Sequence, residues 1–489
     1  MRGIRFYYLN KGYQLAFIAF LFLLVVSIFS NNDIRGVESN VIYTLQQILV
    51  DNSLLYQDPN GLPYTITQYT PLYYIICDFV ISALSIESSE FYMIRIISRG
   101  VSMIFLIGSM FLFFKIMICQ FNLSKKIAFL FSSLLVVFTF PWSSLSRPDG
   151  LILFFVLSAF YFLIRYINSN HSQSILFVGL CSFFAIASKQ NGLILPLIVG
   201  VFFLLTKNWK AILLLIIGFV STLFLMYLIL IIGKYDLTYL RANIIDGINN
   251  KIDVSYALKG AYKDFLIYFG LFSITVIIII KNKIKDWLIP SNSINFLFMV
   301  SLVSWFIISV IFALKTGSGV NYFNELITIM LLILAYELRN NNSSEIELKK
   351  MSSFLLAIGL QVCIIHFFYY TIKISKGIFE EYVSKDTSRK EIVSYLNENL
   401  NNAYFISSDR KINLAIHQKC VLPQFEIHFS SLSKKLFDYS NLNNSFNSGQ
   451  IKYLILHSEL SPILNIDITS LYEFNKKIGN LNIYKLKEN

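Results

Sequence analysis

The chain has 489 residues, of which 55% are hydrophobic and 14% are charged, with a mean hydropathy of +0.60. Its apolar residues form runs of about 18–25, and each run is long enough to cross a hydrocarbon core of roughly 30 Å as a helix, which excludes a soluble fold. The net charge of +12 would suit nucleic acid, but Lys and Arg stand mainly in short clusters between the apolar runs, so membrane topology explains the charge better.

The five cysteines are scattered through the chain, with no CxxC pair and no metal-ligand spacing. This pattern argues against a disulfide framework or a zinc site. No internal repeat is visible.

The first apolar run, residues 13–30, follows Arg2, Arg5 and Lys11 and lacks a small-residue cleavage site, so we interpret it as an uncleaved anchor. Further spans are predicted at about 94–118, 126–141, 149–166, 173–188, 191–206, 209–233, 263–281, 293–314, 320–338 and 352–373. The fold class is therefore an all-α polytopic membrane protein with about eleven transmembrane helices and additional juxtamembrane helices.

Clusters of basic residues set the orientation of these spans. Cytoplasmic turns are predicted at Lys125/Lys126, Lys207/Lys210, Lys281/Lys283/Lys285 and Arg339/Lys349/Lys350. The N-terminus is then cytoplasmic, and everything after residue 374 is external. Residues 72–86 have both ends on the outer side, which favours a juxtamembrane or re-entrant helix over a crossing.

Two stretches are not membrane-like. Residues 31–71 form a first external loop with helical apolar spacing in its first half, which predicts an amphipathic helix at the interface. Residues 376–489 are rich in Asn, Ser and Lys and predict a small external α/β domain, with a helix at 386–400 and strands near 403–407, 451–457 and 481–486. The chain thus divides into a transmembrane domain, 1–375, and a soluble domain, 376–489.

Ionisable groups in or near a membrane are costly and are usually retained for a function. Here they gather at the external ends of helices, where they could converge on one cavity at the outer leaflet. The groups are Asn31-Asn32-Asp33 through Glu38, Arg147-Pro148-Asp149, Lys189-Gln190-Asn191, Lys315 through Asn321, and Glu325.

An ordered series of motifs supports a family resemblance. It comprises Gly36-Val37-Glu38, Leu55 through Pro59, Pro63 through Tyr74, Arg95 through Ser98, Arg147-Pro148-Asp149, Lys189 through Gly192 and Gly317 through Glu325. This series, which covers most of residues 1–340, resembles the GT-C membrane glycosyltransferases. The similar group contains bacterial protein O-mannosyltransferases and lipid A aminoarabinose transferases (glycosyltransferase family 39-like).

The resemblance implies an enzyme that takes a hexose or pentose from a polyprenyl phosphate in the outer leaflet. The sugar goes to a glycan, lipid or protein acceptor of the cell envelope, and the location is the plasma (bacterial inner) membrane. A first-loop carboxylate would deprotonate the acceptor, in an inverting reaction, while cations hold the lipid phosphate as it leaves. Such a donor requires no nucleotide-binding Gly-rich loop, and none is visible.

The family often carries an adjacent Asp-Glu pair in the first loop, whereas here Asp33 and Glu38 are separate. Glu38 lies in the better-matching stretch, so it is the preferred base and Asp33 the competing one. Glu38 could instead only solvate the interfacial helix. A divalent metal bound by these two carboxylates stays open, because two carboxylates alone specify no metal.

The remaining site candidates are expected to bind substrate: Arg147, Asp149, Lys189, Lys315, Asn321, Tyr322, Glu325 and Tyr69. Arg147, Lys189 and Lys315 are external cations, which the positive-inside rule disfavours unless they bind phosphate. Asp149 could equally cap a helix, Lys189 could snorkel, and Asn321 through Glu325 could form interhelical hydrogen bonds.

Other functional classes fit the pattern less well. A transporter or flippase of a lipid-linked sugar would normally show repeat symmetry and charges near the midplane. A non-catalytic scaffold would leave the external carboxylates and cations unexplained, and an O-antigen-type polymerase is a weaker enzymatic alternative.

Overall fold

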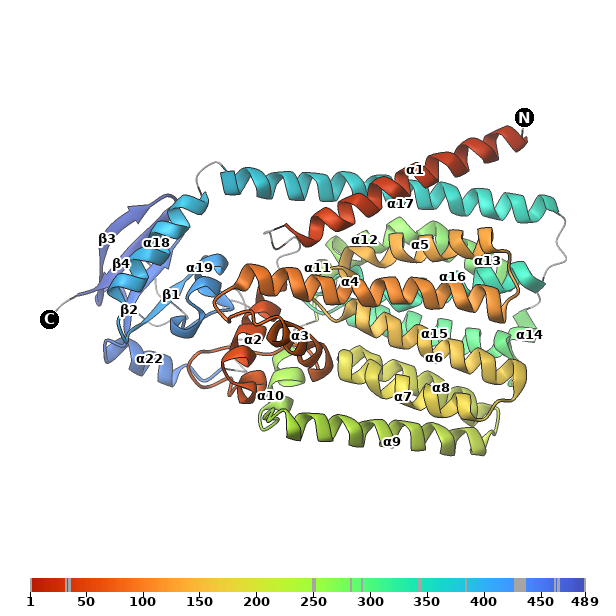
Figure 1. Ribbon diagram of the computed structural model, residues 1–489, viewed down its shortest axis with the longest axis horizontal. Coiled ribbons are helices and arrows are strands. Elements are labelled where there is room, and N and C mark those ends of the chain that lie inside the picture. The colour runs from red at the N-terminus through yellow and green to blue at the C-terminus, as the bar shows by residue number, and fades with distance from the viewer. Residues whose placement is uncertain are drawn as a thin grey trace.

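A computed structural model describes residues 2–30, 33, 37–248, 252–281, 284–291, 293–340, 345–382, 385–425, 437–460, 463 and 467–487. Asn31, Asn32, Arg35, Gly36 and Lys283 therefore lie outside the described residues. Long helices run side by side through most of the molecule, and a small mixed sheet lies at the end away from the N-terminus (Figure 1).

Nine helical stretches of the described chain are long and apolar enough to cross a membrane. They are built from α1 (Arg2–Ile28), α4 (Phe91–Lys115) with the π turn η2 (Ile116–Gln120), α5 (Lys125–Ser143), α6 (Asp149–Ser169), α9 (Trp209–Ile232), α11 to α13 (Val254–Lys259, Ala261–Phe265, η5 Leu266–Tyr268 and Phe269–Lys281), α15 (Ile294–Ala313), η6 (Val320–Phe323) with α16 (Asn324–Asn340), and α17 (Glu345–Tyr382). The polytopic all-α class is confirmed.

Three further apolar helices are shorter: α3 (Pro71–Ala83), α7 (Gln173–Ser188) and α8 (Ile194–Leu205), the last preceded by η3 (Gln190–Leu193). The sequence-based count of about eleven crossings includes α7 and α8, which lie beside the long helices (Figure 1). That count stays a prediction, as does the juxtamembrane assignment of α3. The short helices α10 (Leu240–Ile244), η4 (Asp246–Ile248) and α14 (Ile284–Leu288) complete this part of the chain.

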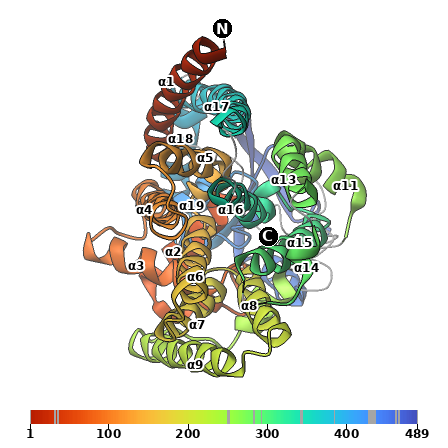
Figure 2. The same cartoon turned by 90° about the vertical axis from the view of Figure 1, so that its right-hand side faces the viewer.

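Helix α16 lies in the middle of the bundle when the molecule is viewed from the end away from the sheet (Figure 2). Its side chains from Leu326 to Ala335 are all buried, although they point to every side of the helix. Helices α7 and α9 approach closely because Gly179 and Gly218 carry no Cβ; a Cβ at Gly218 would lie 2.1 Å from the Leu176 carbonyl oxygen. Small residues of this kind are the usual contact between membrane helices.

The first loop, which follows α1, contains α2 (Glu38–Val50) and η1 (Asn52–Tyr56). The predicted helix is present, but its polar residues are buried as well as its apolar ones: Ser39, Thr44, Gln46 and Gln47 are all covered. The reason is that helix α19 (Arg410–Ala415) of the C-terminal domain packs against α2, with Gln46 donating to the Leu414 carbonyl oxygen at 2.9 Å. Helix α2 is thus enclosed between protein layers.

The C-terminal domain comprises α18 (Lys385–Asn399), β1 (Tyr404–Ser407), α19 (Arg410–Ala415), η7 (His417–Lys419), α22 (Ser440–Asn447), β2 (Ile451–Leu456), β3 (Tyr472–Ile478) and β4 (Leu481–Leu486). The sheet order is β1-β2-β4-β3, with β1 parallel to β2 and the other pairs antiparallel. The predicted helix and three strands are present. The sequence interpretation missed the edge strand β3.

The first loop forms part of the hydrophobic core of the C-terminal domain. Tyr64 and Ile66 are buried in one cluster with Ile406, Leu454 and other residues of that domain. The Gln424 amide exchanges two hydrogen bonds with the backbone of Ile66, at 3.1 and 2.8 Å. The loop and the domain are therefore held together by core packing and by paired hydrogen bonds.

Candidate functional site

A buried ionic cluster is centred on Asp149, at the first turn of α6. One carboxylate oxygen, Oδ1, accepts hydrogen bonds from Lys189 Nζ at 2.6 Å and Asn321 Nδ2 at 3.1 Å. The other, Oδ2, lies 3.1 Å from Arg147 Nε. All four side chains are buried, and they come from three separate helix junctions. The structure thus brings together four of the residues that the sequence interpretation selected.

Close backbone approach positions the two sides of this cluster. A Cβ on Gly150, the residue after Asp149, would lie 2.7 Å from the Ser102 carbonyl oxygen of α4. A Cβ on Gly192 would lie 2.1 Å from the Ala185 carbonyl oxygen, at the turn that follows Lys189. Glycine is therefore needed at both positions for Asp149 and Lys189 to meet.

Aromatic rings surround the cations. The Arg147 guanidinium lies 5.4 Å from the Tyr69 ring centroid and 4.9 Å from that of Trp142, and Lys189 Nζ lies 5.0 Å from that of Tyr322. These distances are within the range of cation–π attraction. Tyr69 and Tyr322, both predicted substrate contacts, therefore face the cluster.

The cluster carries more positive than negative charge. Burial alone would lower the pKa of Lys189, but the Asp149 carboxylate raises it above its ordinary value, so Lys189 is an ammonium ion. Within the group of Arg147, Asp149, Lys189 and Asn321, two cations then share one carboxylate, Asp149. Two acids outside this group also act on it: the charge of Glu325 acts on Lys189, and that of Asp33 acts on Arg147. Glu325 is buried beside Lys189 and Asp149, and its Oε2 has no hydrogen-bond partner in the described chain.

Glu38 is completely buried in a two-point ion pair with Arg99 of α4. Arg99 Nε lies 2.7 Å from Glu38 Oε1 and Nη2 lies 2.5 Å from Oε2, while the Ser146 backbone N–H donates to Oε1 at 2.9 Å. Burial would raise the pKa of Glu38, but the charge and hydrogen bonds of Arg99, with Arg95 and Ser146, hold it at about 2. Both oxygens are therefore engaged.

Asp33 lies at the start of α2 and is partly exposed. Its carboxylate accepts hydrogen bonds from the backbone N–H groups of Val37, Glu38 and Ser39, at 2.9 to 3.1 Å. Arg410 of the C-terminal domain lies 3.6 Å away, and the charge of Asp33 also acts on Arg147. Asp33 thus stabilises the N-terminus of α2.

Lys315 lies apart from these contacts. Its Nζ is 5.1 Å from the Phe312 ring centroid, and its backbone forms a bridge with Ile252. Burial lowers the pKa of Lys315, and no carboxylate pairs with it in the described part of the chain. Lys315 is half-buried beside the site rather than joined to Asp149.

Among the described residues, no group of three or more His, Cys, Asp or Glu side chains could hold a metal ion. The two carboxylates considered for a divalent metal differ in availability, because Glu38 is already bound by Arg99. The carboxylate of Asp33, by contrast, is partly exposed to solvent.

The sequence interpretation did not assign Arg99, Ser146, Trp142 or Arg410 to the site. Arg99 could have been noticed, because it stands four residues after Arg95 inside an apolar run, and a buried arginine in a membrane helix needs a partner. Arg410 carries no such signal, since it is one of many basic residues in a soluble domain.

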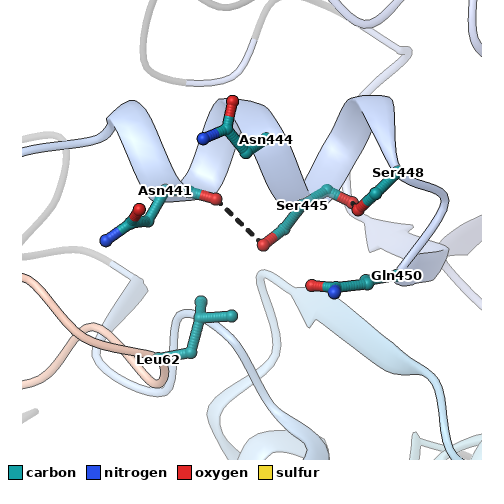
Figure 3. A pocket seen from close by; sticks show the side chains of 6 residues that line it. All are labelled: Leu62, Asn441, Asn444, Ser445, Ser448 and Gln450. Carbon is teal, nitrogen blue, oxygen red and sulfur yellow. Dashed lines mark hydrogen bonds between the residues drawn. The ribbon is translucent and has the colours of Figure 1, made fainter.

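A separate hollow of about 480 Å³ lies where the first loop meets α22 (Figure 3). Its lining is uncharged and mainly amide and hydroxyl: Leu62, Asn441, Asn444, Ser445, Ser448 and Gln450. Such a lining offers hydrogen bonds to neutral polar groups and no charge to an anion.

Comparison with known proteins places this geometry in a fold. No family model and no curated protein matches the sequence. The structure is similar to ArnT from Cupriavidus metallidurans, both bound to undecaprenyl phosphate (TM-score 0.60) and in the apo state (TM-score 0.59), at 12% identity over 97% of this chain and 98% of that one. It is also similar to the oligosaccharyltransferase AglB from Archaeoglobus fulgidus in complex with an inhibitory peptide and a dolichol-phosphate (TM-score 0.55, 11% identity, 92% of this chain and 69% of that one). The chain therefore has the GT-C fold of membrane glycosyltransferases, as the sequence motifs imply.

Proposed function

We propose that the chain is a membrane glycosyltransferase that moves a sugar from a polyprenyl-phosphate donor to an acceptor on the outer side of the membrane. The observation that carries the proposal is the Asp149 cluster, in which Arg147 and Lys189 share one carboxylate and leave one positive charge without a counterion inside the cluster. A phosphate group would supply the missing negative charge. The lipid phosphates bound by ArnT and AglB support this donor class.

In the proposed reaction, an acceptor hydroxyl attacks the anomeric carbon while the bond from that carbon to the lipid phosphate oxygen breaks. The hydroxyl proton passes to a carboxylate, and the electron pair of the broken bond stays on the phosphate. Arg147 and Lys189 stabilise the charge that grows there, which is the usual role of preorganised cations. Attack from the face opposite the phosphate inverts the anomeric configuration.

The geometry favours Asp33 over Glu38 as the base. Glu38 has no exposed surface, and proton transfer to it would require Arg99 to withdraw. Asp33 is partly exposed, and its charge acts on that of Arg147. In this proposal Glu38 positions α2 through Arg99, while Asn321, Tyr322, Glu325, Tyr69 and Lys315 surround the donor sugar and its phosphate.

We further propose that the C-terminal domain, residues 376–489, holds the acceptor near Asp33. Arg410 approaches Asp33 from this domain, and the uncharged hollow of Figure 3 lies on the same domain beside the first loop. The acceptor is a glycan, lipid or protein of the cell envelope.

The test uses the purified full chain with tritium-labelled polyprenyl-phosphate sugars, supplied one at a time, and envelope extract as acceptor. Asp33→Asn should lower turnover by about 10²–10⁴-fold with donor KM nearly unchanged, because a general base contributes about that factor. Lys189→Gln should raise donor KM, because it removes a phosphate contact. Lys210→Gln, an exposed lysine at the other end of the bundle, is the control and should behave like the parent.

Full turnover of Asp33→Asn would remove Asp33 as the base. Unchanged donor KM in Lys189→Gln and Arg147→Gln would remove phosphate binding from those two residues. Movement of labelled lipid across the membrane without sugar transfer would favour the transporter alternative.

A further inference from the structure

A second hollow, of about 530 Å³, lies at the other end of the helical bundle from the Asp149 cluster. Helix α6 begins at Asp149 and ends at Ser169, so the two places are separated by the length of a 21-residue helix, about 30 Å at 1.5 Å per residue. Residues that line this hollow include Gln120, Asn122, Arg165, Asn168, His171 and Arg339, and none of the lining residues is acidic.

Three elements build the hollow. A π turn, η2, continues α4 and brings Gln120 toward the end of α16, where the Gln120 carbonyl oxygen accepts a hydrogen bond from Arg339 Nη1 at 3.2 Å. The Gln120 side-chain oxygen accepts from Asn168 Nδ2 of α6 at 3.2 Å. Gln120 therefore ties the two arginine-bearing helix ends together.

The hollow has the charge of an anion site. Arg165 and Arg339 supply two permanent cations. The Arg165 guanidinium has no ion pair or hydrogen bond with the described part of the chain. Arg339 uses one nitrogen on a neutral carbonyl oxygen, which leaves its charge uncompensated by that contact.

The position of the hollow relative to the membrane indicates which kind of anion it binds. The apolar spans Phe91–Gln120, Asp149–Ser169 and Val320–Arg339 all end at its rim, which places it at the level of lipid headgroups. Basic pockets between helix ends at this level bind the phosphate of anionic lipids. We propose that this hollow binds the phosphate of an anionic phospholipid headgroup, in the leaflet opposite the Asp149 cluster.

The hollow of Figure 3 gives a useful contrast. It is of similar size but lies on the C-terminal domain and carries no charged lining residue. Size alone therefore does not distinguish the two hollows, whereas charge and position at the ends of membrane spans do. The proposal stands independently of sugar transfer.

The test measures phosphatidylglycerol binding to the purified full chain by native mass spectrometry, after reconstitution in mixed phosphatidylglycerol and phosphatidylcholine. The double variant Arg165→Gln/Arg339→Gln should lose bound phosphatidylglycerol at least tenfold, while phosphatidylcholine binding stays as in the parent. Lys210→Gln removes one exposed positive charge elsewhere and should keep the lipid. Arg165→Lys/Arg339→Lys should restore part of the binding, which separates charge from misfolding.

A second arm distinguishes a lipid from free phosphate. Short-chain, water-soluble phosphatidylglycerol should compete at least tenfold more effectively than inorganic phosphate. Equal phosphatidylglycerol binding in the double variant and Lys210→Gln would overturn the proposal. Equal competition by inorganic phosphate would also overturn it, because the site would then recognise a free anion.

Discussion

Glu38 and Arg99 are 61 residues apart in the sequence, yet their side chains form an ion pair in the buried interior. The same arginine also donates to the carbonyl oxygen of Ser27, in the last turn of α1, at 2.7 Å, and to that of Ser30, just after α1 ends, at 2.5 Å. One guanidinium thus joins the first helix, the first loop and α4. Removal of either charge would leave the other buried without a partner, which is costly.

We expect Glu38→Gln to destabilise the protein by about 3–5 kcal/mol, because it leaves the Arg99 charge uncompensated. Thermal unfolding in detergent measures the change. Glu87→Gln, at an exposed glutamate, is the matched control and should change little. The double variant Glu38→Gln/Arg99→Met should be more stable than the two single changes would predict if they were additive.

The pH dependence of this pair has a definite sign. The pKa of Glu38 is about 2 in the folded chain, below its ordinary value, so the pair stabilises the fold above about pH 4.5. That contribution is lost as the pH falls from 4.5 toward 2. Additive losses for Glu38 and Arg99, with no change in acid sensitivity in Glu38→Gln, would contradict a stabilising pair.

At this scale the sequence predicted part of the site. Arg147, Asp149, Lys189 and Asn321 were grouped because each is polar at an external helix end, and the structure places them in contact. The pairing of Glu38 with Arg99 was not predictable in this way. It depends on how α2 inserts beside α4, and that register is set by tertiary packing.

Helix α2 owes the burial of its polar residues to the protein that surrounds it. Its apolar spacing predicts a helix correctly, but the spacing cannot tell membrane from protein as the layer that covers it. Strand β3, by contrast, is an element that the sequence pattern does not predict. Its sequence, YEFNKKI, places several exposed polar and charged residues on an edge strand, so it lacks a clear hydrophobic alternation. Propensity and periodicity favour a loop there.

The contact between α2 and η7 contains a buried histidine. His417 Nδ1 lies 3.3 Å from Gln46 Nε2, and Nε2 of the imidazole has no hydrogen-bond partner among the described residues. Burial lowers the pKa of His417 to about 4. The folded chain therefore holds this imidazole neutral at pH values where an unfolded segment would protonate it.

We expect acidification to weaken this contact. Because the folded pKa is below the ordinary value of about 6.5, the stabilisation is present above pH 6.5 and decreases as the pH falls toward 4, by roughly 1 kcal/mol for the first unit. Hydrogen exchange across residues 410–421, corrected for intrinsic rates, measures the loss. His417→Gln should flatten the pH dependence, whereas His457→Gln, at an exposed histidine, should leave it unchanged. Equal pH dependence in both variants would rule out His417 as the cause.

For the whole molecule, composition and hydropathy predict the polytopic class and the C-terminal domain. They do so because hydropathy is averaged over many residues, so one atypical residue does not change the prediction. The exact number of crossings cannot be predicted in this way, because α7 and α8 are shorter than a typical span. Their status depends on how the bilayer adapts to them. The GT-C architecture itself came from motif order and not from periodicity.

The N-terminus and the C-terminal domain lie at opposite ends of the bundle (Figure 1). The positive-inside rule predicts that the N-terminal end is cytoplasmic and that the C-terminal domain is external, and this prediction can be tested. Cys119 offers a native test, because it is exposed beside the second hollow, whereas the other four cysteines are buried. A membrane-impermeant maleimide should label Cys119 in inverted vesicles and not in intact cells.

The complementary probe is Asn444→Cys, at an exposed position on α22. It should react with the same maleimide in intact cells. The opposite labelling pattern for the two cysteines would mean that the topology is inverted.

The paired hydrogen bonds between Ile66 and Gln424 join residues that are 358 positions apart. At a synthesis rate of about 5–20 residues per second, the ribosome needs roughly 20–70 s to make the intervening chain. During that interval Tyr64 and Ile66 have left the ribosome without the domain that buries them. Under the predicted topology, the first loop stays on the outer side with its apolar side chains uncovered until the last part of the chain has been translocated. The contact between the first loop and the C-terminal domain is therefore completed last, and a chain that stops before residue 424 would leave Tyr64 and Ile66 uncovered.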